Sequence, residues 1–110
     1  MTKGLFIYIF DGRSQSVVRL SQLKLCPAFL YSGYINFSGS LGAKSYFFWL
    51  LESRSEPSSD PLVIWLTGGP GCSSQMALLM ENGPCLVNKD GNGTTLNEFS
   101  WTNKANVMWV

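Results

Sequence analysis

The chain contains no histidine and few charged residues, and each shortage excludes a class of function. Without histidine, these 110 residues alone cannot form a Ser-His-Asp triad or a histidine-ligated zinc site. Charged residues make up 14% of the chain and the net charge is +1, with no basic cluster to attract a polyanion. We therefore expect no nucleic-acid partner and no binding to an anionic membrane surface.

Two further shortages concern targeting and cysteine pairing. No apolar run is long enough to span a bilayer. The apolar run at residues 4–10 is short for a signal peptide and is not followed by a cleavage site of small residues. The three cysteines are an odd number and none has CxxC spacing, so one thiol is free or pairs beyond this chain. We expect neither a metal nor a cofactor.

Enough apolar sequence is present to form a folded core. Hydrophobic residues make up 45% of the chain and aromatic residues 14%, and the length suits one small domain or part of a larger one. Residues 1–30 show no clear pattern and are interpreted as a leader of uncertain structure. Residues 31–110 are interpreted as the structured part.

The pattern from residue 31 onward predicts an antiparallel hairpin that leads into an α/β sheet. Alternation over 31–37 and an aromatic-rich run over 45–52 predict its two strands, joined by a turn at 38–42. The continuous apolar run at 62–66 predicts a strand buried on both faces, and the run at 106–110, apolar after Asn106, predicts another buried strand.

A short helix and three tryptophans complete the predicted core. The helix is expected over 73–80, where Met76, Leu79 and Met80 have helical spacing. The tryptophans expected to be buried are Trp49, Trp101 and Trp109.

The most informative motif is a glycine-rich loop that follows the predicted strand at 62–66. It reads Gly68-Gly69-Pro70-Gly71, and glycine lets backbone N–H groups approach a substrate without a side chain in the way. Such donors stabilise the charge of a tetrahedral intermediate in an oxyanion hole. The alternative from the residues alone is a tight structural turn. A phosphate-binding P-loop is excluded because the loop has no lysine.

Four sequence blocks extend this motif, and with them the chain resembles the N-terminal part of the serine carboxypeptidase family, which includes cathepsin A-like and yeast vacuolar enzymes. The blocks lie at 31–34 (YSGY), 47–54 (FFW to ESR), 60–74 (DPLVIWLTGGPGCSS) and 81–84 (ENGP), continuing to residue 110. The match covers about residues 31–110. The resemblance implies that these residues open an α/β-hydrolase fold in which an antiparallel hairpin leads into a mixed, mostly parallel sheet.

By resemblance, Gly69 donates its N–H to the oxyanion, with Gly68 beside it. The family binds the terminal carboxylate of its peptide substrate at positions that are here Trp65, Thr67, Gly68 and Glu81. A carboxyl group can bind a carboxylate when one of the two is protonated, which fits the acidic optimum of the family. Thr67 stands where asparagine is commoner, and acyltransferase relatives also carry threonine there.

Several other residues have expected roles, the serines and the sequons from their local sequence and the cysteines from the resemblance. Ser73 and Ser74 are expected to cap the following helix, since neither lies in a GxSxG elbow. Cys72 is expected to pair with a cysteine far downstream. Distant partners are also expected for Cys26 and Cys85, with a Cys26–Cys85 pair as the open alternative. Glycosylation candidates are the sequons at Asn36 and Asn92.

The family's nucleophile lies in a downstream Gly-Glu-Ser-Tyr elbow, followed by the aspartate and the histidine of the triad. We therefore expect the complete protein to be a serine-type carboxypeptidase acting on peptides, and this chain, as an N-terminal fragment, to be inactive alone. The alternatives are a serine carboxypeptidase-like acyltransferase and a non-catalytic truncated product. The resemblance favours a vacuolar, lysosomal or secreted protein and leaves the oligomeric state open.

Overall fold

The computed structural model describes residues 18–20, 26, 28 and 30–110. The expected leader at 1–30 therefore falls largely outside the described residues, as does the apolar run at 4–10. In chain order the elements are β1 (Val18–Leu20), β2 (Leu30–Gly39), β3 (Gly42–Leu51), β4 (Leu62–Trp65), α1 (Gln75–Met80), β5 (Cys85–Val87), β6 (Thr94–Leu96), the 3-10 helix η1 (Trp101–Asn103) and β7 (Asn106–Trp109). No helix of the described part has the length and hydropathy that crossing a bilayer requires.

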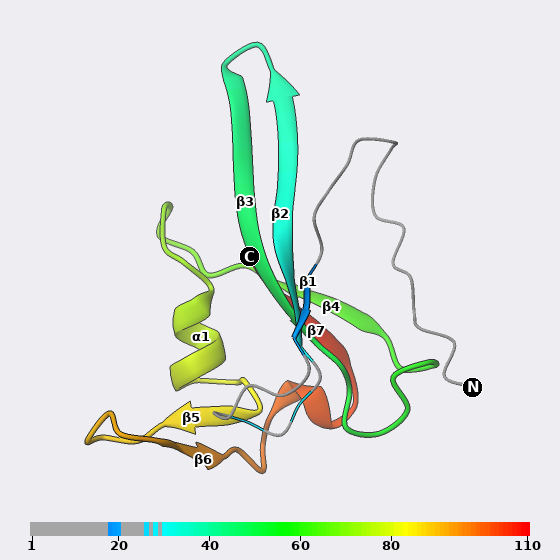
Figure 1. Cartoon of the computed structure of the whole chain (residues 1–110), viewed down its shortest axis with the longest axis vertical. Coiled ribbons are helices and arrows are strands. Elements are labelled where there is room, and N and C mark those ends of the chain that lie inside the picture. Colours follow the sequence, from blue (N-terminus) through cyan, green and yellow to red (C-terminus); the bar gives the residue numbers. More distant parts are fainter. Residues whose placement is uncertain (1–17, 21–25, 27, 29) are drawn as a thin grey trace.

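The strands form a five-stranded sheet in the order β1-β2-β3-β7-β4 and a two-stranded sheet of β5 and β6 (Figure 1). Strand β7 pairs antiparallel with β3 and parallel with β4, so the larger sheet is mixed. Helix α1 and the β5–β6 pair lie between β4 and β7 in the sequence. A mixed sheet with a crossover between parallel strands is consistent with the expected opening of an α/β-hydrolase fold.

Strands β2 and β3 form the predicted hairpin, which is confirmed over ten residues of each strand. The turn is tighter than the sequence suggested, because the pairing continues to Gly39 and Gly42. The outer half of the hairpin projects from the rest of the molecule (Figure 1). Aromatic side chains pack edge-to-face on it, with ring centroids of Tyr34 and Phe47 5.4 Å apart.

Strand β7 lies between β3 and β4 in the sheet, and all four of its residues are buried, as the sequence predicted. Its neighbour β4 differs from the prediction of burial on both faces. Leu62 and Ile64 are 38% and 54% exposed, whereas Val63 and Trp65 pack against the core, so only one face of β4 is covered. Strand β4 also pairs only with β7 among the described strands and is an edge of the described sheet.

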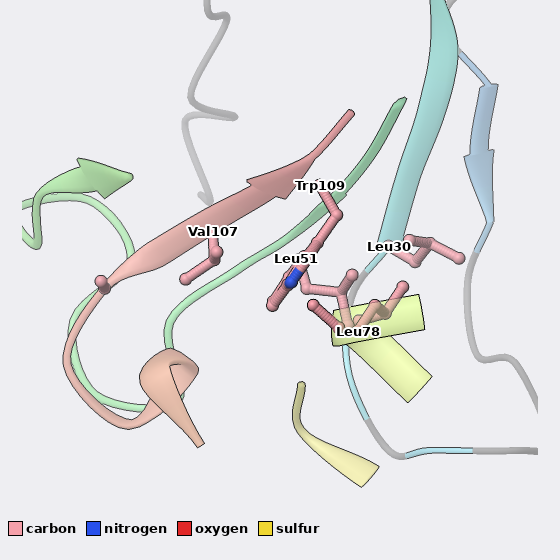
Figure 2. Packing of buried hydrophobic residues seen from close by; sticks show 7 residues of the cluster. Leu30, Leu51, Leu78, Val107 and Trp109 are labelled. Carbon is pink, nitrogen blue, oxygen red and sulfur yellow. The ribbon is translucent and has the colours of Figure 1, made fainter. Parts of the chain in front are cut away.

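The main core lies between the sheet and α1, and Figure 2 shows Leu78 of α1 close to Leu51 and Trp109 of the sheet. Helix α1 contributes Ala77 and Leu78 to this core. Met76 and Met80 are 56% and 70% exposed, so their predicted place on the apolar face is wrong, whereas Leu79 packs against the core. The buried face of the helix is formed by Ala77 and Leu78. A second cluster of Phe48, Leu50 and Met108 occupies the opposite side of the strands.

A disulfide joins Cys26 to Cys85 and corrects the expectation that these two cysteines have distant partners. Cys85 opens β5, and Cys26 precedes β2. Their Cα atoms are 5.8 Å apart, a separation that a disulfide spans. The pairing was one of the alternatives left open by the sequence. It covalently ties the segment before the hairpin to the segment that follows α1.

Candidate functional site

The glycine loop at 66–74 lies at the carboxyl ends of β4 and β7. Val110 N donates to Trp65 O at 3.4 Å, and Ser74 N donates to Val110 O at 3.2 Å. Both ends of the loop are therefore fixed to the same edge of the parallel strand pair. In open α/β sheets, ligands bind in the crevice beyond the carboxyl ends of the strands.

The two serines after the loop have different roles. Ser74 is 1% exposed, and its Oγ accepts from Thr67 N at 2.8 Å. Ser74 occupies the N-cap position of α1 without a side-chain cap bond, so its expected capping role is wrong. Its hydroxyl closes the glycine loop instead. Ser73 precedes the N-cap position, and its Oγ accepts from Gln75 N at 3.3 Å, two residues on, so its expected capping role is wrong as well.

The glycines present backbone groups to solvent. Gly68 and Gly69 are exposed, and neither of their N–H groups has a protein acceptor within the described residues. The Gly69-Pro70 peptide bond is cis, and Gly71 has a φ of 86°, a conformation that favours glycine. A Cβ at Gly69 would lie 2.6 Å from Cys72 Sγ, so a side chain there would displace the sulfur. Unpaired donors on a loop without side chains are what an oxyanion hole requires.

Trp65 and Thr67 form a polar pair beside the glycines. Trp65 Nε1 donates to Thr67 Oγ1 at 3.2 Å, which leaves the hydroxyl hydrogen of Thr67 available to donate elsewhere. The ring of Trp101 meets Trp65 edge-to-face, with centroids 4.8 Å apart. Sequence reasoning missed this contact.

The three tryptophans expected in the core have different environments. Trp109 is fully buried, as predicted, and Trp49 is half-buried. Trp101 is 48% exposed, so its prediction was wrong. The cause is its place on the surface helix η1, where one side of its ring faces Trp65.

Glu81 lies at the C-cap of α1, at the opposite end of the helix from the glycine loop (Figure 1). A six-residue helix is about 9 Å long. The side chain is exposed, and in the described part of the chain no hydrogen bond joins it to Trp65 or Thr67. The structure thus brings Trp65, Thr67 and Gly68 together and leaves Glu81 separate, so its role stays a prediction.

The turn after α1 is held by polar residues that sequence reasoning did not single out. Asn82 Oδ1 accepts from the Trp109 indole at 3.1 Å, and Asn97 Nδ2 donates to Gly83 O at 2.9 Å. Arg54 Nη1 donates to Asn97 O at 2.9 Å, and partial burial lowers the pKa of its guanidinium, which stays protonated at neutral pH. The sequence at 82–84 (Asn-Gly-Pro) could have pointed to these residues, because it predicts a turn, and a buried turn needs donors for its carbonyls.

The remaining candidate positions lie apart from the loop. Cys72 is a free, exposed thiol in the structure, and its expected downstream partner stays a prediction. Asn36 is exposed on the hairpin, where its Oδ1 accepts from Ser45 Oγ at 2.6 Å. Asn92 is exposed in the turn between β5 and β6.

Comparison with known proteins gives consistent matches. The family model described as serine carboxypeptidase matches residues 22–110. Carboxypeptidase S1 homolog A of Arthroderma otae is 55% identical over 64 residues, which cover 58% of this chain and 10% of that protein. Carboxypeptidase Y homolog A of Phaeosphaeria nodorum is 48% identical over 80 residues, covering 73% of this chain and 14% of that protein.

A mammalian relative gives a similar match. The lysosomal protective protein of Mus musculus is 44% identical over 80 residues, covering 73% of this chain and 16% of that protein. The chain thus spans between 10% and 16% of the length of these three relatives. The family model covers most of the chain, including the whole glycine loop. The chain belongs to the serine carboxypeptidase family.

Proposed function

We propose that a full-length protein carrying this segment is a serine-type carboxypeptidase, which hydrolyses the C-terminal residue from a peptide. The observation that carries the proposal is the exposed glycine loop at the carboxyl ends of β4 and β7. Its Gly68 and Gly69 N–H groups have no acceptor in the described part of the protein. Family membership supplies the chemical context for these donors.

In this proposal the N–H of Gly69 stabilises the oxyanion, with Gly68 lining the site. Trp65, Thr67, Gly68 and Glu81 bind the terminal carboxylate of the peptide. Trp65 holds the Thr67 oxygen through its indole, so the hydroxyl can donate to a carboxylate. The nucleophile, the base and the aspartate come from other parts of the full-length protein, since this sequence has no histidine. The 110-residue chain alone is therefore expected to be inactive.

The proposed setting is a vacuolar, lysosomal or secreted protein in which residues 31–110 open an α/β-hydrolase domain. The Cys26–Cys85 disulfide fits an oxidising compartment. Such a compartment also permits glycosylation at Asn36 and Asn92, whose side chains are exposed. The lysosomal name of the mouse relative agrees with this setting.

A second candidate function is acyl transfer, and Thr67 favours it. A threonine in place of asparagine offers a single short donor to the terminal carboxylate. An acyltransferase would form the same acyl-enzyme and pass the acyl group to an alcohol instead of water.

The two functions separate in one assay of the full-length protein. We would supply a blocked dipeptide, and in parallel a glucose ester with an alcohol acceptor. Release of a free C-terminal amino acid is the expected result and would rule out a dedicated acyltransferase. Transfer to the alcohol without peptide hydrolysis would overturn the carboxypeptidase proposal.

A further inference from the structure

The turn that carries Glu81 occupies residues 81–84, and each of its four carbonyl oxygens accepts a hydrogen bond from elsewhere in the chain. Asn97 Nδ2 donates to Glu81 O at 3.3 Å and to Gly83 O at 2.9 Å. Asn82 O accepts from Ser100 Oγ at 3.0 Å and from Trp101 N at 3.2 Å. Pro84 O accepts from Asn97 N at 2.9 Å and from Arg54 Nη2. Residues 82–84 are buried, so their carbonyls need donors from the protein in place of water. Here the main chain around Glu81 is held in one place.

Asn97 is the centre of this arrangement. It is 8% exposed, and its Nδ2 donates to the carbonyls of Glu81 and Gly83, on either side of Asn82. Its Oδ1 accepts from Phe99 N at 3.0 Å, so the amide orientation is fixed. A primary amide places two donors on one nitrogen, whereas a serine offers one and an ionised aspartate none. The bridge across the turn therefore depends on asparagine.

The turn is also confined on its other sides. Asn82 Oδ1 accepts from the indole of fully buried Trp109, which ties the turn to β7. A Cβ at Gly83 would lie 1.8 Å from Leu78 O, so the turn already touches the last turn of α1. The main chain at 81–84 is therefore tied to β7 and to α1 as well as to Asn97.

We propose that Asn97 is a positioning residue for Glu81. The Asn97 amide fixes the backbone at Glu81. It thereby sets the position at which the Glu81 carboxyl group contacts the terminal carboxylate of the peptide. This inference rests on the proposed function, in which Glu81 binds that carboxylate. Asn97 does not itself touch the substrate.

The experiment measures kcat and KM of the full-length protein on a blocked dipeptide and on the same dipeptide ending in a carboxamide. Only the first substrate offers a carboxylate to Glu81. We expect Asn97→Ala to raise KM for the free acid about tenfold and to leave KM for the carboxamide unchanged. In a Glu81→Gln background, Asn97→Ala should add less than about a twofold change, because the group that it positions is gone.

Asn106→Ala is the matched control. Asn106 is buried like Asn97, its Nδ2 donates to the carbonyls of Pro57 and Asp60, both at 3.0 Å, and its Oδ1 accepts from Ser53 N at 3.0 Å. These partners lie in the loop between β3 and β4 and not in the turn at 81–84. The control should leave the preference for the free acid unchanged. The proposal is overturned if Asn97→Ala lowers activity on both substrates equally, if the preference stays within about twofold of wild type, or if the Asn97 effect persists in the Glu81→Gln background.

A thermal melt shows first whether each variant is folded. If Asn97→Ala is not folded, Asn97→Ser decides the question, since it keeps one donor and should lose part of the preference. A wild-type protein that does not favour the free acid overturns the proposed function and this inference with it. If the wild type and the Asn97 variant favour the free acid equally, the inference is overturned and the proposed function stands.

Discussion

The side chain of Thr67 takes part both in the folded structure and in the proposed carboxylate site. Its hydroxyl oxygen accepts from the Trp65 indole, and the backbone N–H of the same residue donates to buried Ser74 Oγ. One residue is thus held on both sides before any substrate binds. Preorganised donors of this kind stabilise a bound charge without reorganisation cost at the time of reaction.

Replacing Thr67 with valine keeps the shape of the side chain and removes the hydroxyl. We expect Thr67→Val in the full-length protein to raise KM for a blocked dipeptide about tenfold, because a donor to the substrate carboxylate is lost. The free energy of unfolding should fall by only about 1 kcal/mol.

Thr95→Val is the control for this substitution, since Thr95 lies on β6 and its hydroxyl donates to Asn88 Oδ1, away from the glycine loop. An unchanged KM in Thr67→Val would remove Thr67 from the proposed carboxylate site.

At the scale of elements, the junction between α1 and β5 is closely packed around Gly83. Gly83 is buried, and a Cβ there would lie 1.8 Å from the carbonyl oxygen of Leu78 and 2.9 Å from its Cδ1. We expect Gly83→Ala to destabilise the fold by about 3 kcal/mol, since backbone has to shift to accept the methyl group. Denaturant unfolding measures this loss.

Gly39→Ala serves as the comparison for that variant, because a Cβ at Gly39 meets nothing within 4 Å. Its free energy of unfolding should lie within about 1 kcal/mol of wild type. Equal effects of the two substitutions would contradict the packing described for the turn.

The loop between β3 and β4 carries a pH-dependent contact. The Ser53 hydroxyl donates to Asp60 Oδ2 at 2.5 Å, and Glu56 N donates to the same oxygen at 3.0 Å. The Ser53 hydrogen bond is the main cause that lowers the pKa of Asp60, and the backbone N–H of Glu56 adds to it. A carboxyl with a lowered folded pKa stabilises the fold above its unfolded pKa of about 3.9, and this stabilisation is lost as the pH falls through the folded value.

The consequence is measured as the melting temperature between pH 6 and pH 2. We expect Ser53→Ala to lose stability at pH 6 and to show a shallower decline with acid than wild type. Ser59→Ala is the control, because the Ser59 hydroxyl bonds to the backbone of Glu56 and not to the carboxylate. A parallel decline in Ser53→Ala and wild type would contradict the assignment.

Sequence pattern predicted the elements whose partners lie nearby or whose residues are largely apolar. The β2–β3 hairpin follows from alternation, and the buried strand β7 follows from a run that is apolar after Asn106. The same rule failed for β4, because an apolar run does not reveal whether both faces of the strand are covered. The Cys26–Cys85 pair depends on how the chain returns after α1, which spacing alone does not determine.

The candidate site was also predictable only in part. The glycine loop and its family were predictable, since the motif is local and specific. The contacts of Ser74 with Thr67 and of Trp101 with Trp65 were not, because each joins the motif to a side chain whose direction is set by packing. Asn97 was likewise hidden among the polar residues near the C-terminal end.

At the scale of the whole molecule, the described sheet has an apolar edge. Leu62, Ile64 and Leu66 alternate along β4 and the residues after it, and they are 38%, 54% and 72% exposed. An exposed apolar edge strand pairs readily with another chain. We expect the isolated 110-residue chain to self-associate, as measured by size exclusion with light scattering.

Ile64→Thr is the variant that tests this edge, because it keeps β-branching and reduces apolar surface. Self-association should decrease in it. A soluble wild-type monomer with a sharp cooperative melt would contradict this expectation.

The central claim is that the glycine loop and Glu81 together recognise a terminal carboxylate. The direct measurement is the preference of the full-length protein for a blocked dipeptide over its carboxamide, followed from acidic to neutral pH in wild type and in Glu81→Gln. If two carboxyl groups share a proton, the wild-type preference should be strongest at acidic pH and fall as the pH rises. Glu81→Gln should flatten this dependence, since an amide donates at every pH. The same pH dependence in both proteins would contradict the claim.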